Sequence, residues 1–173
     1  MKRFLLVASL FVGYVGYNGS QVTAQTAQKL TLEDITGGKY NPQYVYGVNP
    51  MKDGESYTQL SNDSKRIIRR SFKTGKELGV VFDAETARGP KKLEAIDGYI
   101  MSPDERRILL RTQTRPIYRR SYTAVYYIYD VENKKFEALS DGGPQQMPTF
   151  SPDGNSIAFV RDNNLFLVKL LFG

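Results

Sequence analysis

The amino-acid sequence predicts an all-β fold built from repeated antiparallel units. Three related turn sequences begin at Asn49, Ser102 and Ser151, so they lie 53 and 49 residues apart. A short apolar run follows each turn, as expected of strands buried between polar ends. The 173 residues also include 12 Tyr and 9 Phe, and aromatic side chains favour pleated, half-buried surfaces.

The three turns share a recognisable chemistry. They read Asn49-Pro50-Met51-Lys52-Asp53-Gly54, Ser102-Pro103-Asp104-Glu105 and Ser151-Pro152-Asp153-Gly154. Proline fixes φ at one corner of such a turn, and aspartate hydrogen-bonds to the local backbone. Gly154 supplies the positive φ that a tight turn often needs.

The second copy is the most complete unit. Residues 98–101 and 107–111 flank its turn, and residues 124–130 and 136–139 follow as a predicted hairpin. About four strands in about 50 residues are typical of one blade of a β-propeller, a ring of 4–8 such sheets. A β-sandwich with similar turns is the alternative, and the nearly equal spacing favours the propeller.

The other two copies are less regular. In the first copy, residues 57–60, 65–72 and 78–82 are the predicted strands. The third copy reaches only its third strand, at residues 165–169. We therefore predict a partial β-propeller of about two and a half four-stranded antiparallel blades.

The N-terminus has the composition of a secretory signal. Lys2 and Arg3 precede an apolar core at residues 4–12, and Ala24 ends a sequence suited to cleavage before Gln25. The core is too short to span a bilayer, and the mature chain offers no other candidate span. We therefore expect a periplasmic or secreted protein.

The resulting domain plan has three parts. Residues 1–24 are the signal peptide, residues 25–48 are a lead-in segment, and residues 49–173 are an incomplete propeller domain. A short helix is expected near residues 30–35, where Thr31 and Asp34 fit a loose N-terminal cap.

Two absences exclude several kinds of chemistry. The chain contains no His, so it cannot form a Ser-His-Asp triad by itself. It contains no Cys, which excludes disulfides, thiol nucleophiles and thiolate metal sites. The net charge is +6, which is too small and too dispersed to favour a nucleic-acid partner.

One segment resembles a known family. Residues 118–130 read Tyr-Arg-Arg-Ser-Tyr-Thr-Ala-Val-Tyr-Tyr-Ile-Tyr-Asp, and they resemble a propeller segment of the dipeptidyl peptidase IV family, which belongs to the prolyl oligopeptidase-type serine peptidases. The turns at Ser102 and Ser151 match in order and spacing. The resemblance is strong over residues 97–168 and faint over residues 30–88.

The resemblance implies an eight-bladed propeller that caps an α/β-hydrolase domain. Enzymes of this family remove N-terminal dipeptides, usually after Pro or Ala. The family's paired Glu motif and its Ser, Asp and His triad have no counterpart in these 173 residues. We therefore expect an N-terminal propeller fragment that is inactive and poorly folded alone, with the peptide substrate and the missing hydrolase domain as its partners.

The resemblance also implies one substrate-binding residue. The Arg of the family's Arg-x-Ser-Tyr pattern binds a backbone carbonyl of the substrate, and by position this residue is Arg119. A guanidinium suits the role because it is always charged and offers a rigid fork of donors. Arg120 is the neighbouring alternative. No catalytic residue, metal ligand or cofactor is expected.

A second function class uses the same turns. A free-standing periplasmic propeller, similar to TolB-like domains, would bind a protein partner instead of a peptide substrate. The Arg-x-Ser-Tyr-Thr-Ala segment favours the peptidase interpretation, because a plain scaffold does not need it.

Overall fold

The computed structural model describes residues 29–42 and 44–170, and the chain divides into two units after residue 43. The described part of the first unit contains helix α1 (Leu32–Thr36). The Thr31 hydroxyl accepts a hydrogen bond from the backbone N of Asp34 at 3.1 Å, so the predicted short helix and its cap are confirmed. The predicted signal peptide, residues 1–24, lies outside the described residues.

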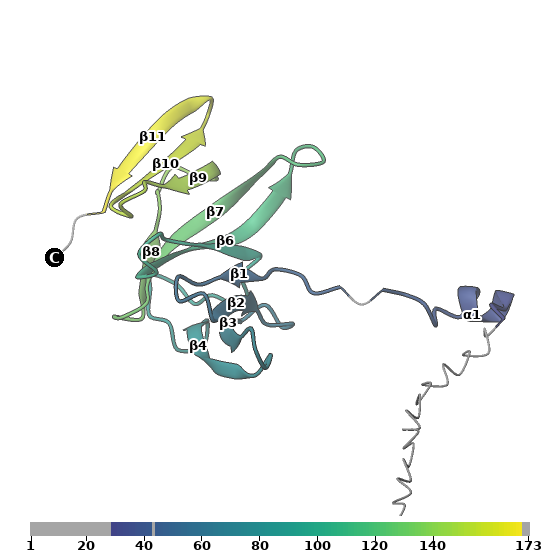
Figure 1. The fold of residues 1–173 in the computed structure, drawn as a ribbon. Coiled ribbons are helices and arrows are strands. Elements are labelled where there is room, and N and C mark those ends of the chain that lie inside the picture. The colour runs from purple at the N-terminus through teal and green to yellow at the C-terminus, as the bar shows by residue number, and fades with distance from the viewer. Residues whose placement is uncertain (1–28, 43, 171–173) are drawn as a thin grey trace, which may run out of the picture. The chain divides into compact units, whose positions relative to one another are not determined.

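The described part of the second unit is built from strands. They form three antiparallel sheets of four, four and three strands (Figure 1), which confirms the prediction of a partial propeller. The first sheet contains β1 (Asn49–Pro50), β2 (Ser56–Leu60), β3 (Arg66–Ser71) and β4 (Glu77–Asp83). The second contains β5 (Gly98–Met101), β6 (Arg107–Pro116), β7 (Tyr122–Asp130) and β8 (Lys135–Ala138). The third contains β9 (Gln146–Phe150), β10 (Ser156–Arg161) and β11 (Asn164–Lys169).

The middle sheet is buried on both faces, which explains its aromatic sequence. Ile108 and Leu110 on β6 pack into a core shared with Ile67 and Phe82 of the first sheet. The intervening Leu109 packs into a second core with strands of the third sheet. Because successive side chains of a strand point to opposite faces, both faces of such a strand must be apolar.

The same alternation runs along β7. Tyr127 and Tyr129 belong to the core with the first sheet, whereas Tyr126 and Ile128 belong to the core with the third. The Tyr129 ring meets the edge of Phe82 at a centroid distance of 5.0 Å. Sheets that bury both faces against their neighbours in chain order are the packing unit of a propeller.

The repeated turn occurs at the three predicted places and at one more. Ser61, Ser102 and Ser151 each donate a side-chain hydrogen bond to the Asp two residues later. Each serine oxygen also accepts a hydrogen bond, at 2.9 Å, from the backbone N five residues later. The turn at Ser61 joins β2 to β3 and is an additional copy. The predicted first copy joins β1 to β2, the place in its sheet that the Ser102 turn has between β5 and β6 and the Ser151 turn has between β9 and β10. Its backbone closes in the same way, with hydrogen bonds from Met51 N to Ser56 O and from Gly54 N to Met51 O, so the three predicted turns are confirmed.

Candidate functional site

The β6–β7 hairpin carries the residue predicted to bind substrate. Its ladder runs from the pair Arg107 and Asp130 to the pair Pro116 and Tyr122. The loop at residues 117–121 closes with a hydrogen bond of 2.8 Å from Ile117 N to Ser121 O. Figure 1 shows this tip projecting beyond the sheet. We call residues 113–123, which form the end of the hairpin, the arm.

Arg119 lies at the tip of the arm. Its side chain and that of Arg120 are exposed, and neither makes a hydrogen bond or ion pair with another residue in the described ranges 29–42 and 44–170. The adjacent Tyr118 is 81% exposed. The guanidinium of Arg119 is thus free to meet a ligand, and its role in substrate binding stays a prediction.

A β-bulge sets the direction of the arm. Thr112 pairs with Val125 and Arg115 pairs with Thr123, so two residues of β6 oppose one of β7. Gln113 has a φ of +53°, in the left-handed region where a side chain is disfavoured. Such a bulge bends its strand and increases the local twist, so the arm leaves the sheet at an angle fixed here.

Asp97 lies just before β5, outside the hairpin, and is hydrogen-bonded to the bulge. Its carboxylate accepts a hydrogen bond from the backbone N of Thr114 at 2.8 Å. Its backbone N donates to Arg111 O at 2.7 Å. The extra backbone donor that the bulge creates is therefore satisfied by a side chain from the neighbouring segment.

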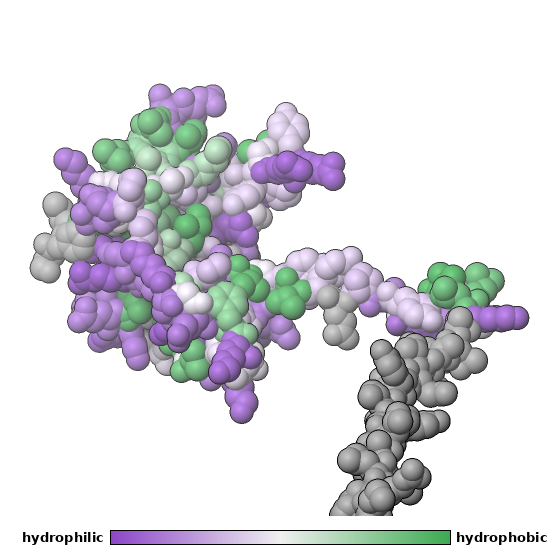
Figure 2. All heavy atoms as spheres, viewed as in Figure 1, coloured by the Kyte–Doolittle hydropathy of each residue, from purple (hydrophilic) through white to green (hydrophobic). Residues whose placement is uncertain are grey.

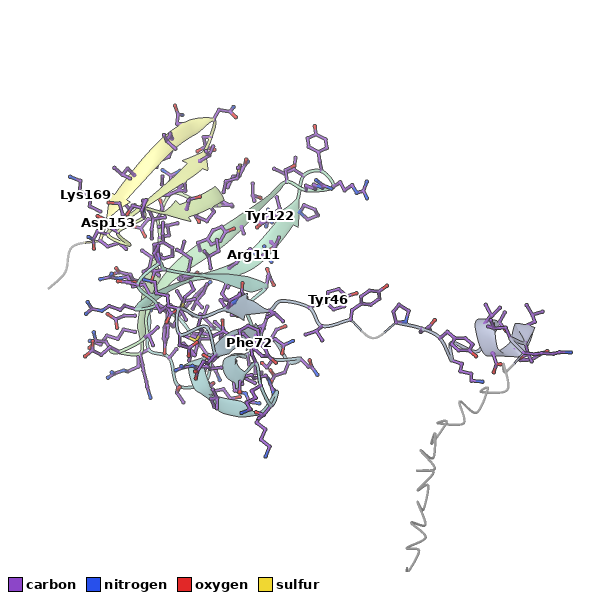
Figure 3. The ribbon with its side chains drawn as sticks, in the orientation of Figure 1. Tyr46, Phe72, Arg111, Tyr122, Asp153 and Lys169 are labelled. Carbon is purple, nitrogen blue, oxygen red and sulfur yellow. The ribbon has the colours of Figure 1, made fainter. Side chains whose placement is uncertain are left out.

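Arg111 connects the segment around Asp97 to β7. One terminal nitrogen of its guanidinium donates to the Tyr122 hydroxyl at 2.7 Å, and the other donates to Asp97 O at 2.8 Å. Figure 3 labels Arg111 and Tyr122 at the base of the arm. A Cβ on Gly98 would lie 2.7 Å from the guanidinium, so a larger residue there would push the guanidinium out of this position.

Burial and neighbouring polar groups shift the pKa values of the two tyrosines at the foot of the arm. Burial works to raise the pKa of Tyr122, but the hydrogen bonds with Tyr126 and Arg111 outweigh it and leave the pKa lowered. Burial, together with the neighbouring Tyr122, raises the pKa of Tyr126. Arg111 therefore faces two tyrosine hydroxyls, and its positive charge is not neutralised by an ion pair within residues 44–170.

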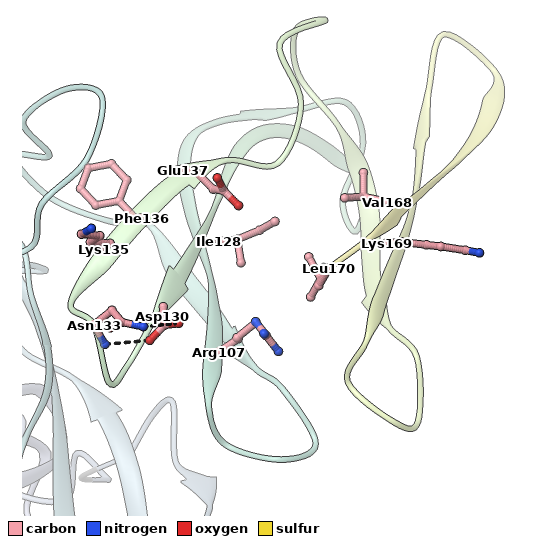
Figure 4. Close-up of a pocket in the computed structure, with 10 residues that line it drawn as sticks. All are labelled: Arg107, Ile128, Asp130, Asn133, Lys135, Phe136, Glu137, Val168, Lys169 and Leu170. Carbon is pink, nitrogen blue, oxygen red and sulfur yellow. Dashed lines mark hydrogen bonds between the residues drawn. The ribbon is translucent and has the colours of Figure 1, made fainter. Parts of the chain in front are cut away.

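A separate hollow of about 660 Å³ lies between the second and third sheets. Figure 4 shows Arg107 and Asp130 on one side and Lys169 and Leu170 on the other. Because Arg107 and Asp130 form the pair farthest from the arm, this hollow and Arg119 lie at opposite ends of the same hairpin.

The described part of the chain contains no group of three or more Asp and Glu side chains placed to hold a metal ion. It also contains no helix long and apolar enough to cross a membrane.

Comparisons with known proteins agree with the fold. Residues 102–173 match the model of the dipeptidyl peptidase IV N-terminal region. A probable dipeptidyl-aminopeptidase B of Colletotrichum graminicola is 47% identical over 90% of this chain and 19% of its own length. Human prolyl endopeptidase FAP is 30% identical over 82% of this chain and 18% of its own length.

A solved structure shows the same similarity. The crystal structure of Porphyromonas gingivalis dipeptidyl peptidase 4 matches with a TM-score of 0.70 and 38% identity. The match covers 82% of this chain and 20% of that protein. The chain thus spans about a fifth of the length of the relatives that it matches.

The successive antiparallel sheets place the chain in the class of β-propeller proteins. Within that class, the chain belongs to the dipeptidyl peptidase IV family and represents part of its N-terminal region. These matches do not favour the alternative of a TolB-like binding module.

The sequence identified the tip of the arm and missed its base. Asp97, Arg111 and Gln113 looked like ordinary polar residues beside a strand, and nothing in their order indicated a bulge. One weak signal of an unusual hairpin is its length. The strand β6 continues for five residues past the apolar run that ends at Arg111.

Proposed function

We propose that this chain is part of the propeller of an exported serine-type dipeptidyl peptidase, in which it positions peptides for a hydrolase domain. In the complete enzyme, Arg119 binds a backbone carbonyl of the peptide, and dipeptides are released after Pro or Ala. The observation that carries the proposal is an exposed guanidinium without a described partner, on a projecting hairpin with the Arg-x-Ser-Tyr-Thr-Ala sequence.

The chemical step belongs to residues outside this chain. A chain without His or Cys has no imidazole or thiol with which to activate a nucleophile in the manner of serine or cysteine peptidases. The contribution of Arg119 is therefore binding and orientation. Holding a carbonyl with a charged donor aligns the peptide relative to the attacking group.

The test is substitution of Arg119 in the full-length protein that carries this chain. Arg119→Ala removes a charge-assisted hydrogen bond of about 1.5–3 kcal/mol, so kcat/KM for a Gly-Pro amide should fall roughly 10- to 150-fold. The thermal midpoint should barely change, because the side chain is exposed.

The control is Arg120→Ala, which removes the same charge from the neighbouring exposed residue. It should leave kcat/KM within about a factor of two. Loss of activity in Arg120→Ala together with a silent Arg119→Ala would show that the substrate is bound by the other arginine.

Export is the second part of the proposal. The basic and apolar N-terminus supports it, with cleavage after Ala24. Mass spectrometry of the protein recovered from the periplasm or the medium should find Gln25 as the first residue. A mature cytosolic protein that retains Met1 would contradict export.

A further inference from the structure

We propose that Asp97 and Arg111 are positioning residues that clamp the base of the arm and thereby direct Arg119 toward the substrate. The clamp itself is a feature of the fold, whereas its effect on catalysis rests on the function proposed above. Neither residue belongs to the Arg-x-Ser-Tyr-Thr-Ala segment.

The first half of the clamp pins the bulge. In a regular ladder, each backbone N of β6 would point to β7 or to its other neighbour, β5. At the bulge, Thr114 N is turned out of the ladder and donates to the carboxylate of Asp97 at 2.8 Å. This contact joins the arm to a segment that lies 17 residues earlier in the chain.

The second half of the clamp spans the two strands of the arm. Arg111 donates to Tyr122 OH and to Asp97 O at 2.7 and 2.8 Å. Its guanidinium carbon also lies 4.8 Å from the centroid of the Tyr122 ring. Because Tyr122 is the first residue of β7, this contact fixes the strand that leads away from the tip.

Both halves of the clamp hold the same part of the chain, the arm. Beyond the bulge, only the pairs at Arg115 and Pro116 join the two strands before the loop begins. The arm therefore has few contacts of its own, and its direction depends on its base. A small rotation at residues 113–114 would displace the guanidinium of Arg119 by a much larger distance.

The chemistry of the two contacts differs, so they can be separated. Asp97 acts through a carboxylate oxygen that an asparagine side chain can replace. Arg111 acts through two donors in a fixed fork, which the single ammonium group of lysine cannot reproduce. Asp97→Asn is therefore the conservative variant, and Asp97→Ala and Arg111→Lys are the disruptive ones.

The first experiment measures hydrogen exchange in the full-length protein that carries this chain. In Asp97→Ala and Arg111→Lys, the amides of residues 112–123 should exchange about 5- to 10-fold faster, and those of β10 should be unchanged. Asp97→Asn should restore slow exchange. Glu132→Ala is the matched control, because it removes an exposed carboxylate in the β7–β8 turn. Unchanged exchange in the arm of both disruptive variants would overturn the clamp.

The second experiment measures kinetics with a Gly-Pro amide in the same proteins. Asp97→Ala should raise KM about 3- to 10-fold and change kcat by less than a factor of two. In an Arg119→Ala background, Asp97→Ala should have no further effect, because the clamp acts through Arg119. Equal losses in both backgrounds would overturn the positioning role.

The two proposals fail in different ways. If Arg119→Ala is kinetically silent, the proposed substrate contact is wrong, and the exchange measurement still decides whether the clamp exists. If Arg119→Ala is damaging while Asp97→Ala loosens the arm without changing KM, the substrate contact stands and the positioning role is overturned.

Discussion

At the scale of single residues, the repeated turns place one residue in a costly backbone conformation. Ser64, Glu105 and Gly154 are the fourth residues of the turns that begin at Ser61, Ser102 and Ser151, and they have φ values of +57°, +61° and +73°. Glycine adopts this region readily, whereas a residue with a Cβ pays about 1–2 kcal/mol. The fold therefore imposes the same conformation on three different side chains.

This comparison yields opposite expectations for two substitutions. Ser64→Gly should stabilise the protein by about 0.5 kcal/mol or leave it unchanged, because relief of the strain is partly offset by the entropy of glycine. Gly154→Ala should destabilise it by about 1 kcal/mol. Denaturant unfolding checks both values, and destabilisation by Ser64→Gly would contradict the argument.

Gln145 is a residue whose importance depends on burial. Its side chain is fully buried, and its amide oxygen accepts a hydrogen bond from the backbone N of Tyr126 at 3.0 Å. Its backbone exchanges two further hydrogen bonds with Ala124, at 3.0 and 2.7 Å. It thus continues the pairing of β7 where β8 has ended.

Gln145→Leu should leave the backbone N of Tyr126 buried without an acceptor, at a cost of about 1–3 kcal/mol. Gln59→Leu is the control, because the Gln59 amide makes an exposed hydrogen bond to Tyr46 O at 3.0 Å. Its loss should cost less than about 0.5 kcal/mol. Similar unfolding midpoints for the two variants would show that burial is not the deciding factor.

At the scale of elements, the hairpin turns share a set of stabilised carboxylates. Hydrogen bonds from the Ser61 and Ser151 hydroxyls, followed by those from nearby backbone N atoms, lower the pKa values of Asp63 and Asp153. The Ser56 hydroxyl and two backbone N atoms lower the pKa of Asp53 in the same way. The turns of the first and third sheets are therefore more stable when the carboxyl groups of these aspartates are ionised.

The pH dependence follows from the direction of these shifts. A carboxyl whose pKa is lower in the folded state binds protons more readily when unfolded, so stability is full above the unfolded pKa and falls with acidification. The thermal midpoint should therefore drop as the pH falls below about 4. Asp153→Asn should reduce this dependence, and a variant that remains equally acid-sensitive would contradict the assignment to Asp153.

At the scale of the whole molecule, the last described sheet has an apolar outer surface. Phe166 and Val168 of β11 pack toward the core, whereas Leu165 and Leu167 are 77% and 63% exposed. Figure 2 shows apolar residues gathered over β9–β11. Within residues 44–170, the outer edge of β11 also has no neighbouring strand.

Such a surface should make the 173-residue chain self-associate, because an open apolar edge templates further strand pairing. Leu167→Lys should reduce association at micromolar concentration in light scattering, since charged edge residues oppose pairing. Val45→Lys is the control, because Val45 is 74% exposed in the segment before β1. A wild-type chain that stays monomeric would contradict the expectation.

Local chemistry in the sequence was sufficient to predict the fold class, the strand order of the middle sheet and the position of Arg119 in a loop. Alternation of side chains, the Ser-Pro-Asp turns and the Arg-x-Ser-Tyr-Thr-Ala segment are all readable from neighbouring residues. Only the tertiary structure revealed the additional turn at Ser61, because its likeness to the others depends on hydrogen bonds. It also decided the bulge at Gln113, the clamp of Asp97 and Arg111, and the burial of Gln145, since these depend on contacts between residues that lie 11 to 19 positions apart.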